Sequence, residues 1–198
     1  MKSSRHILPL VALLLLCVGV SASAQTVPSD AKEFNKDGLT FNYPAGWSFN
    51  DTSDKDAQKM SFGRADSEAQ ITVFVFRTHV STPERVAEAK KVLVDKYVAS
   101  TKKQFEGIDP KTTGEPATST IGTVASEGVR IRASMDGVPG SAEIQSAVVG
   151  QRLVVLTFLG SDKALTKAAP AWDLMRNTLK VEEPQPKTAP QPAASPKP

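Results

Sequence analysis

The stretch Gly38-Leu-Thr-Phe-Asn-Tyr-Pro-Ala-Gly-Trp-Ser-Phe49 decides how the chain folds. In its first half, Leu39, Phe41 and Tyr43 alternate with polar residues, which is the period-two pattern of a strand with one buried face. The stretch contains no catalytic side chain. We therefore interpret it as a signature of the fold and not of an activity.

A corner follows within the same stretch. Proline lacks the backbone N–H that a sheet needs and glycine tolerates positive φ angles, so Pro44-Ala-Gly46 interrupts the strand. Trp47 and Phe49 then resume the alternation, which predicts an opening hairpin of two short strands around a tight corner. Because Trp47 lies where this pattern places the core, packing is its expected role.

Two later segments, Gln70–Arg77 and Arg152–Leu159, are apolar at successive positions and not only at alternate ones. Such a strand lies in the centre of a sheet that is covered on both faces. Further strands are expected at residues 58–64, 118–124, 129–135 and 142–149. The last of these forms a hairpin with Arg152–Leu159 across Gly150-Gln151.

Two helices can cover the sheet. Ser81-Thr-Pro-Glu84 supplies a hydroxyl N-cap, a proline in the first turn and an acid, which predicts a helix that runs to about Phe105. Ser161-Asp162 begins a second helical region, and we expect Pro170 to kink or split it because the ring clashes with the preceding turn. The order of elements predicts an α+β fold, a single-domain α/β/α sandwich with a mainly antiparallel sheet of about six to seven strands.

The first 24 residues have the pattern of a secretory signal peptide. Basic Lys2 and Arg5 precede an apolar run, and a small-residue site predicts cleavage between Ala24 and Gln25. The mature protein is therefore expected to be periplasmic or secreted. A lipid anchor on Cys17 is the rival interpretation, which is disfavoured because a lipoprotein signal has a small residue before the cysteine and this chain has leucine.

The mature chain divides into three parts on composition. We expect a flexible lead-in at 25–32, one domain at 33–181 and a disordered proline-rich tail at 182–198. Cys17 is the only cysteine, so the mature domain is expected to fold without a disulfide. No transmembrane segment is expected in the mature protein, because the apolar run of the signal is removed.

The charge balance argues against nucleic-acid binding. The whole chain has 24 Lys and Arg residues against 21 Asp and Glu residues, but four of the basic residues lie in the signal peptide and the tail. The domain is thus almost neutral and has no basic stripe to neutralise phosphates.

Catalytic and metal-binding patterns are weak. The mature chain has a single histidine, His79, and no Gly-x-Ser-x-Gly elbow to present a serine to it. Asp51, Asp54 and Asp56 alternate as in a calcium loop, but the glycine and glutamate that an EF-hand requires are missing. We expect no catalytic residue, no cofactor and no metal site.

Several features together resemble the Mog/PsbP-like family over about residues 33–181. They are the opening strand and corner, the long helix after a strand that is apolar on both faces, and the closing strand and helix. The sharpest motif consists of Phe41, Tyr43, Pro44, Gly46 and Trp47. The resemblance implies an α/β/α sandwich used for binding or accessory roles, usually without catalysis. The partners of the best-known members do not transfer, since none of their residue motifs is present here.

Three functional hypotheses remain open at this point. The first is an exported, non-enzymatic accessory protein that binds a protein partner of the envelope or the exterior. The second is a periplasmic carrier or sensor of a small apolar ligand held between sheet and helix. The third is a hydrolase that depends on His79.

Overall fold

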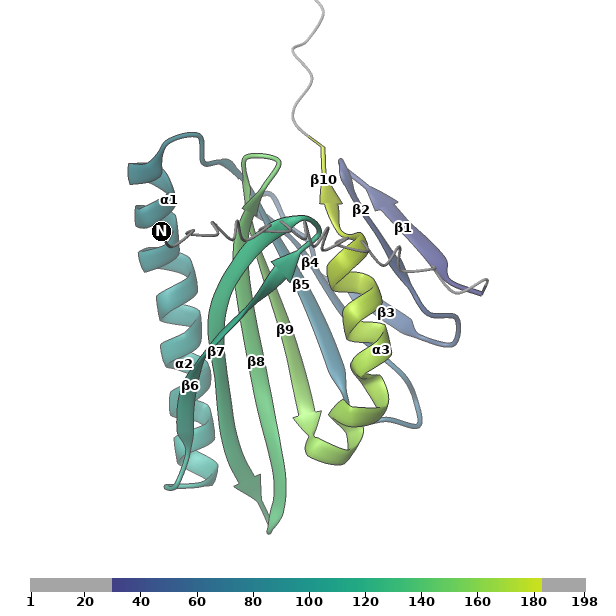
Figure 1. Ribbon diagram of the computed structural model, residues 1–198, viewed down its shortest axis with the longest axis vertical. Coiled ribbons are helices and arrows are strands. Elements are labelled where there is room, and N and C mark those ends of the chain that lie inside the picture. The colour runs from purple at the N-terminus through teal and green to yellow at the C-terminus, as the bar shows by residue number, and fades with distance from the viewer. Residues whose placement is uncertain (1–29, 183–198) are drawn as a thin grey trace, which may run out of the picture.

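The computed structural model describes residues 30–182 as a large antiparallel sheet with helices on both faces and a small second sheet at one side (Figure 1). The predicted α+β class and α/β/α sandwich are confirmed, and the large sheet has seven strands, against the predicted six to seven. The predicted signal peptide, with Cys17, Ala24 and Gln25, and nearly all of the predicted tail lie outside the described residues.

The large sheet has the strand order β3-β4-β5-β9-β8-β7-β6, and all of its neighbours are antiparallel. Its strands are β3 (Ser48–Asp51), β4 (Ala57–Gly63), β5 (Gln70–His79), β6 (Thr113–Ile121), β7 (Val124–Met135), β8 (Val138–Val149) and β9 (Arg152–Ser161). The predicted hairpin across Gly150-Gln151 is confirmed as β8–β9. Strands β6 and β7 are longer than predicted, because residues 113–128, which are rich in Thr, Ser and Gly, are paired in the β6–β7 hairpin almost up to its turn at Gly122-Thr123.

One face of the sheet is covered by a continuous helical rod. It consists of α1 (Pro83–Ala89), a π-helical segment η1 (Lys90–Val94) and α2 (Asp95–Ile108). Thr82 is the N-cap residue and its side chain accepts a hydrogen bond from the backbone N–H of Arg85. The rod therefore begins where the sequence predicts and ends three residues later than predicted.

The other face is covered by α3 (Asp162–Thr178), which Ser161 caps as expected. Pro170 does not split this helix, contrary to one of the two predicted outcomes, and helical structure runs through it. Proline costs the helix one backbone hydrogen bond, and packing against the sheet compensates, since Ala168, Ala171 and Trp172 on either side of Pro170 are buried.

The predicted opening hairpin around the Pro44–Gly46 corner is wrong, because its first strand belongs to a small second sheet. This sheet consists of β1 (Lys32–Lys36), β2 (Leu39–Tyr43) and β10 (Lys180–Val181), in the order β1-β2-β10. Strand β2 therefore pairs with β1 and β10, and it does not pair with β3. Asp37 and Gly38, with φ angles of 50° and 74°, form the tight turn of the β1–β2 hairpin. Strand β1 also begins at Lys32, the last residue of the predicted lead-in.

The Pro44–Gly46 corner carries the chain from the small sheet to the edge of the large one. Its turn is closed by a hydrogen bond from the N–H of Trp47 to the carbonyl oxygen of Pro44 (3.3 Å), with Gly46 at φ 81°. Trp47 is buried, whereas Phe49 is 41% exposed. The alternation does not continue through the corner as predicted, because Trp47 belongs to the turn and β3 starts after it.

The core has two layers, one on each face of the large sheet. The layer under α3 is built around Ile71, Val73 and Val75 of β5 and includes the small sheet. The layer under the α1–η1–α2 rod contains Phe74 and Phe76 of the same strand. The prediction that this strand is central and covered on both faces is confirmed.

A buried arginine joins the two sheets. Arg152 of β9 is 6% exposed, and its guanidinium group donates to the carbonyl oxygens of Asp37 (3.3 Å) and Phe76 (3.0 Å) and to Oε1 of Gln58 (2.5 Å). Gln58 is fully buried and its amide donates to the carbonyl oxygen of Lys36 (2.9 Å). Burial lowers the pKa of Arg152 from its ordinary value, but a guanidinium with several acceptors stays charged.

We expect Arg152→Met to lower the free energy of unfolding by about 2–4 kcal/mol, because it leaves buried acceptors without donors. The matched control is Arg77→Met, which removes an exposed ion pair to Asp37 (3.0 Å) and should cost about 1 kcal/mol or less. Urea unfolding of both variants measures the difference. Equal losses would show that Arg152 does not join the sheets.

Candidate functional site

The α2-facing side of the sheet is left uncovered at one end. Helix α2 stops at Ile108, whereas the β7–β8 hairpin continues to its turn at Asp136-Gly137. Figure 1 shows the end of α2, the hairpin turn and the start of α3 at the same end of the molecule. Side chains that would otherwise lie under a helix therefore meet solvent there.

A pocket of about 550 Å³ lies at this uncovered end, and we call it the end pocket. Its lining is mainly apolar and comes from α2, the β7–β8 hairpin, the end of β9 and the loop before β5. The lining residues are Glu68, Phe105, Ile108, Ala133, Met135, Asp136, Val138, Gly140, Leu159, Gly160 and Ser161. Pockets of this size and composition are typical of binding sites for apolar groups.

One glycine of β8 contributes to the hollow. Gly140 of β8 pairs with Ala133 of β7, so the small side chain of Ala133 lies beside a residue with no side chain. A Cβ atom at Gly140 would come within 2.7 Å of the carbonyl oxygen of Gly160, so no larger residue fits there without a shift of the backbone. The close approach of β8 and β9 thus requires glycine and also leaves space in the pocket.

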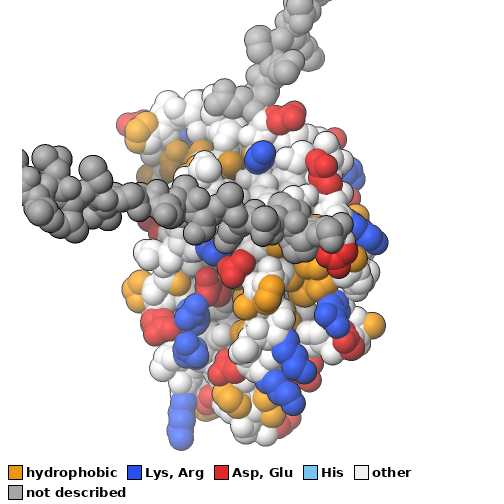
Figure 2. Space-filling view, turned by 45° about the vertical axis from the view of Figure 1, so that its right-hand side comes forward, with side chains coloured by type: hydrophobic (Ala, Val, Ile, Leu, Met, Phe, Trp, Pro, Cys, Tyr) orange, Lys and Arg blue, Asp and Glu red, His pale blue; other side chains and the backbone are white. Residues whose placement is uncertain are grey.

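Three large apolar side chains at the rim are exposed to solvent. The exposed fractions are 54% for Ile108, 60% for Met135 and 54% for Val138. Apolar side chains grouped beside a pocket, unlike singly scattered ones, are typical of a contact surface. The space-filling view in Figure 2 shows hydrophobic side chains at the surface near the lower end of the molecule, among charged ones.

A second cleft, of about 500 Å³, lies where the Pro44–Gly46 corner meets the start of α3. Pro44 and Trp47 line it, together with charged residues of which Arg64 and Asp66 form an ion pair (2.5 Å). The other charged residues of its lining are Glu68, Lys163 and Lys167, and the cleft offers less apolar surface than the end pocket. The end pocket is therefore the stronger candidate.

The sequence motif lies mostly in the core and away from the end pocket. Phe41 and Tyr43 are buried, and their rings contact the ring of Phe62 at centroid distances of 5.5 and 5.3 Å. Pro44 and Trp47 reach the second cleft. The second hypothesis from the sequence placed a ligand between sheet and helix, but it assigned no residue of the end pocket. The available signal was a turn flanked directly by Met135 and Val138, two large apolar residues with no place in a core.

His79 lies at the end of β5, opposite Arg152 in the sheet register. It is half-buried, and no hydroxyl or carboxyl group of residues 30–182 is hydrogen-bonded to it. The geometry that a serine–histidine pair needs is thus not assembled around His79 in this part of the chain.

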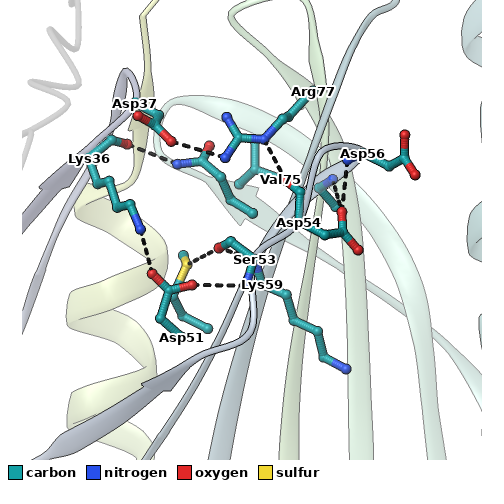
Figure 3. Close-up of polar contacts among 12 residues, drawn as sticks. Lys36, Asp37, Asp51, Ser53, Asp54, Asp56, Lys59, Val75 and Arg77 are labelled. Carbon is teal, nitrogen blue, oxygen red and sulfur yellow. Dashed lines mark hydrogen bonds and ion pairs between the residues drawn. The ribbon is translucent and has the colours of Figure 1, made fainter.

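The three aspartates at the end of β3 and in the loop after it do not converge on a common point. Asp51 binds Lys36 (2.7 Å) and the N–H of Ser53, whereas Oδ1 of Asp54 accepts hydrogen bonds from the N–H groups of Asp56 (2.8 Å) and Ala57 (2.9 Å). Figure 3 shows the carboxylates of Asp51 and Asp56 far apart and pointing in different directions. Among residues 30–182, no group of His, Cys, Asp or Glu side chains could hold a metal ion.

The surface charges are mixed in sign. On the face in Figure 2, acidic and basic side chains are interspersed. Several are paired across neighbouring strands, as Arg130 is with Glu143. None of the helices within residues 30–182 has the length and hydrophobicity to cross a membrane.

Comparison with protein-family models and with curated proteins finds no match. Solved structures do match. A crystal structure of a Bacteroides thetaiotaomicron protein aligns with a TM-score of 0.50 and 13% identity, over 78% of this chain and 49% of that one. The present chain thus spans about half the length of that protein. The likeness is one of fold.

Two further structures match less well. The solution structure of cyanobacterial PsbP from Synechocystis has a TM-score of 0.49 and 10% identity, over 82% of this chain and 98% of that one. The crystal structure of LpqN, described as involved in cell envelope biogenesis of Mycobacterium tuberculosis, has a TM-score of 0.43 and 9% identity, over 77% of this chain and 90% of that one. A PsbP protein, from the family that the sequence resembles, is therefore among the matched structures.

The Lys36–Asp51 contact between the two sheets generates a pH prediction. The hydrogen bond from Lys36, followed by those from Ser53, lowers the pKa of Asp51 from 3.8 to about 2. A carboxyl group with a lowered pKa in the folded state stabilises the fold above its unfolded pKa and loses this effect as the pH falls. We expect the difference in the free energy of unfolding between the wild type and Asp51→Asn to have its full size at pH 5 and to shrink as the pH falls toward 2.

Urea unfolding at several pH values measures this difference. Lys36→Met is the matched control, since it keeps the carboxylate but removes the main cause of its lowered pKa, and it should reduce the same pH dependence. A difference that stays constant down to pH 2 would contradict the account.

Proposed function

We propose that this chain is an exported, non-enzymatic binding protein that engages a protein partner through the end pocket. The observation that carries the proposal is the group of exposed apolar side chains around an apolar hollow, where α2 ends before the β7–β8 hairpin does. Covering an exposed apolar surface of this kind with a partner removes it from water, which favours association.

The open rim favours a protein partner. Ile108, Met135 and Val138 are each more than half exposed, so they extend the apolar surface beyond the hollow itself. A protein can insert one large side chain into the hollow and cover the rim with its neighbours, which is the usual arrangement of an anchor residue in an interface.

A small apolar ligand is the second candidate. The volume of about 550 Å³ falls within the range of ligand pockets, and the pocket lies between helix and sheet, as this hypothesis expects. A ligand there would leave the rim side chains in water, whereas ligand pockets usually bury most of the ligand surface. The protein partner is therefore the proposal that we develop.

Export is supported by the sequence. Lys2, Arg5, the apolar run and the cleavage pattern before Gln25 are those of a secretory signal. A mature domain with no cysteine needs no disulfide chemistry in an oxidising compartment. The partner is then a protein of the envelope or the exterior.

Site-specific photo-crosslinking tests the proposal. A photoreactive amino acid at Val138 should give a discrete crosslinked species in an envelope extract, and the same group at Val92 should not. Val92 is a matched control because it is 44% exposed but lies in η1, away from the pocket. The crosslinked protein is then identified, purified and titrated with the unlabelled mature chain.

Two variants decide whether binding uses the pocket. Ala133→Phe places a ring in the hollow beside Gly140, and Val138→Asp puts a charge on the rim. Each should weaken binding about tenfold or more, as loss of an interface anchor does. Val92→Asp should bind like the wild type. Because Val138 is exposed, its variant should fold normally even if Ala133→Phe does not. Wild-type affinity in both pocket variants would contradict the proposal.

A further inference from the structure

Among residues 30–182, the two charged side chains that line the end pocket, Glu68 and Asp136, are both acidic, and no lysine or arginine of this part of the chain lines it. Glu68 also lines the second cleft, together with the basic Arg64, Lys163 and Lys167. The side chains of Glu68 and Asp136 are both exposed, and neither forms an ion pair with any of residues 30–182. By contrast, the acidic Asp66 in the second cleft is neutralised by Arg64 (2.5 Å).

The two carboxylates lie on opposite sides of the hollow. Glu68 is in the loop before β5, and Ser161 Oγ donates a hydrogen bond to one of its oxygens (3.0 Å), which leaves the other free. Asp136 is in the turn between β7 and β8. In the strand order β5-β9-β8-β7, these positions are at the two ends of the pocket wall, with the apolar lining between them.

We propose that the occupant of the end pocket is a partner segment in which a large apolar side chain is flanked on both sides by lysine or arginine. This inference rests on the proposed function and adds the chemical class of the partner. The apolar side chain fills the hollow, while the flanking cations face Glu68 and Asp136 across the rim. Complementary charges at a rim add selectivity and speed of association more than affinity.

The same arrangement selects against anionic amphiphiles. A fatty acid or another apolar ligand with a carboxylate would place its charge near Glu68 or Asp136, where like charges repel. The acidic rim therefore distinguishes a basic peptide segment from an anionic lipid of similar hydrophobicity.

Three synthetic peptides of sequence GKWLKG, GQWLQG and GEWLEG, with both termini blocked, test the inference on the mature chain. They share the apolar centre and differ only in flanking charge. At low ionic strength we expect the basic peptide to bind about three- to tenfold more tightly than the neutral one, and the acidic peptide more weakly, as for exposed charge pairs. The preference should shrink in 0.5 M salt because surface charges are then screened.

The double variant Glu68→Gln and Asp136→Asn should abolish the preference and leave binding of the neutral peptide unchanged. Both substitutions suit their sites, because glutamine still accepts the bond from Ser161 and asparagine tolerates the φ of 51° at residue 136. The control is the double variant Glu88→Gln and Asp95→Asn. Both of these residues lie roughly 20 Å or more from Ile108 along the helical rod. This control variant should keep the preference.

The outcomes separate the two proposals. Equal affinity for all three peptides, with binding lost in Ala133→Phe, would overturn the charge preference and leave the pocket as a binding site. Both the proposed function and the charge preference would be overturned if no peptide binds and if Ala133→Phe leaves the affinity for the envelope partner unchanged. Loss of the preference in the control variant would show that general surface charge causes it, which also overturns the inference.

Discussion

The structure depends on two strands, β5 and β9, that are apolar on both faces. Val73 and Val75 of β5 pack under α3, while Phe74 and Phe76 of the same strand pack under the α1–η1–α2 rod. Since a sheet with two apolar faces is stable only when both are covered, the fold needs a helical layer on each side. The small sheet completes the cover beside α3, and Arg152 of β9 fixes it there by binding the Asp37 turn.

The candidate site follows from the same constraint. The helical rod covers the sheet only as far as Ile108, and the β7–β8 hairpin extends beyond it. The apolar pattern on the α2-facing side continues past the end of the helix, so part of it remains open as the end pocket. In this account the function is carried by surface that the fold leaves uncovered, whereas the buried motif around Trp47 stabilises the sandwich.

Much of the fold could be predicted from local patterns, because caps and periodicity act within a few residues. Thr82-Pro83 and Ser161 mark both helix starts. The small sheet was missed because β1 has a single buried residue, Phe34, and β10 has only two residues. Met135 and Val138 marked the rim in the sequence, but the hollow itself could not be predicted, because it depends on how far α2 reaches along a hairpin that is distant in sequence. Only three-dimensional packing sets that length.

We propose that the uncovered end of the sheet, and not the cleft beside the Trp47 corner, binds apolar groups. An amide chemical-shift map of the isotope-labelled mature chain, titrated with neutral benzyl alcohol, tests this choice between the two sites. We expect the largest shifts at Ile108, Ala133, Met135 and Val138. Shifts confined to the second cleft, at Trp47 and the start of α3, would contradict it.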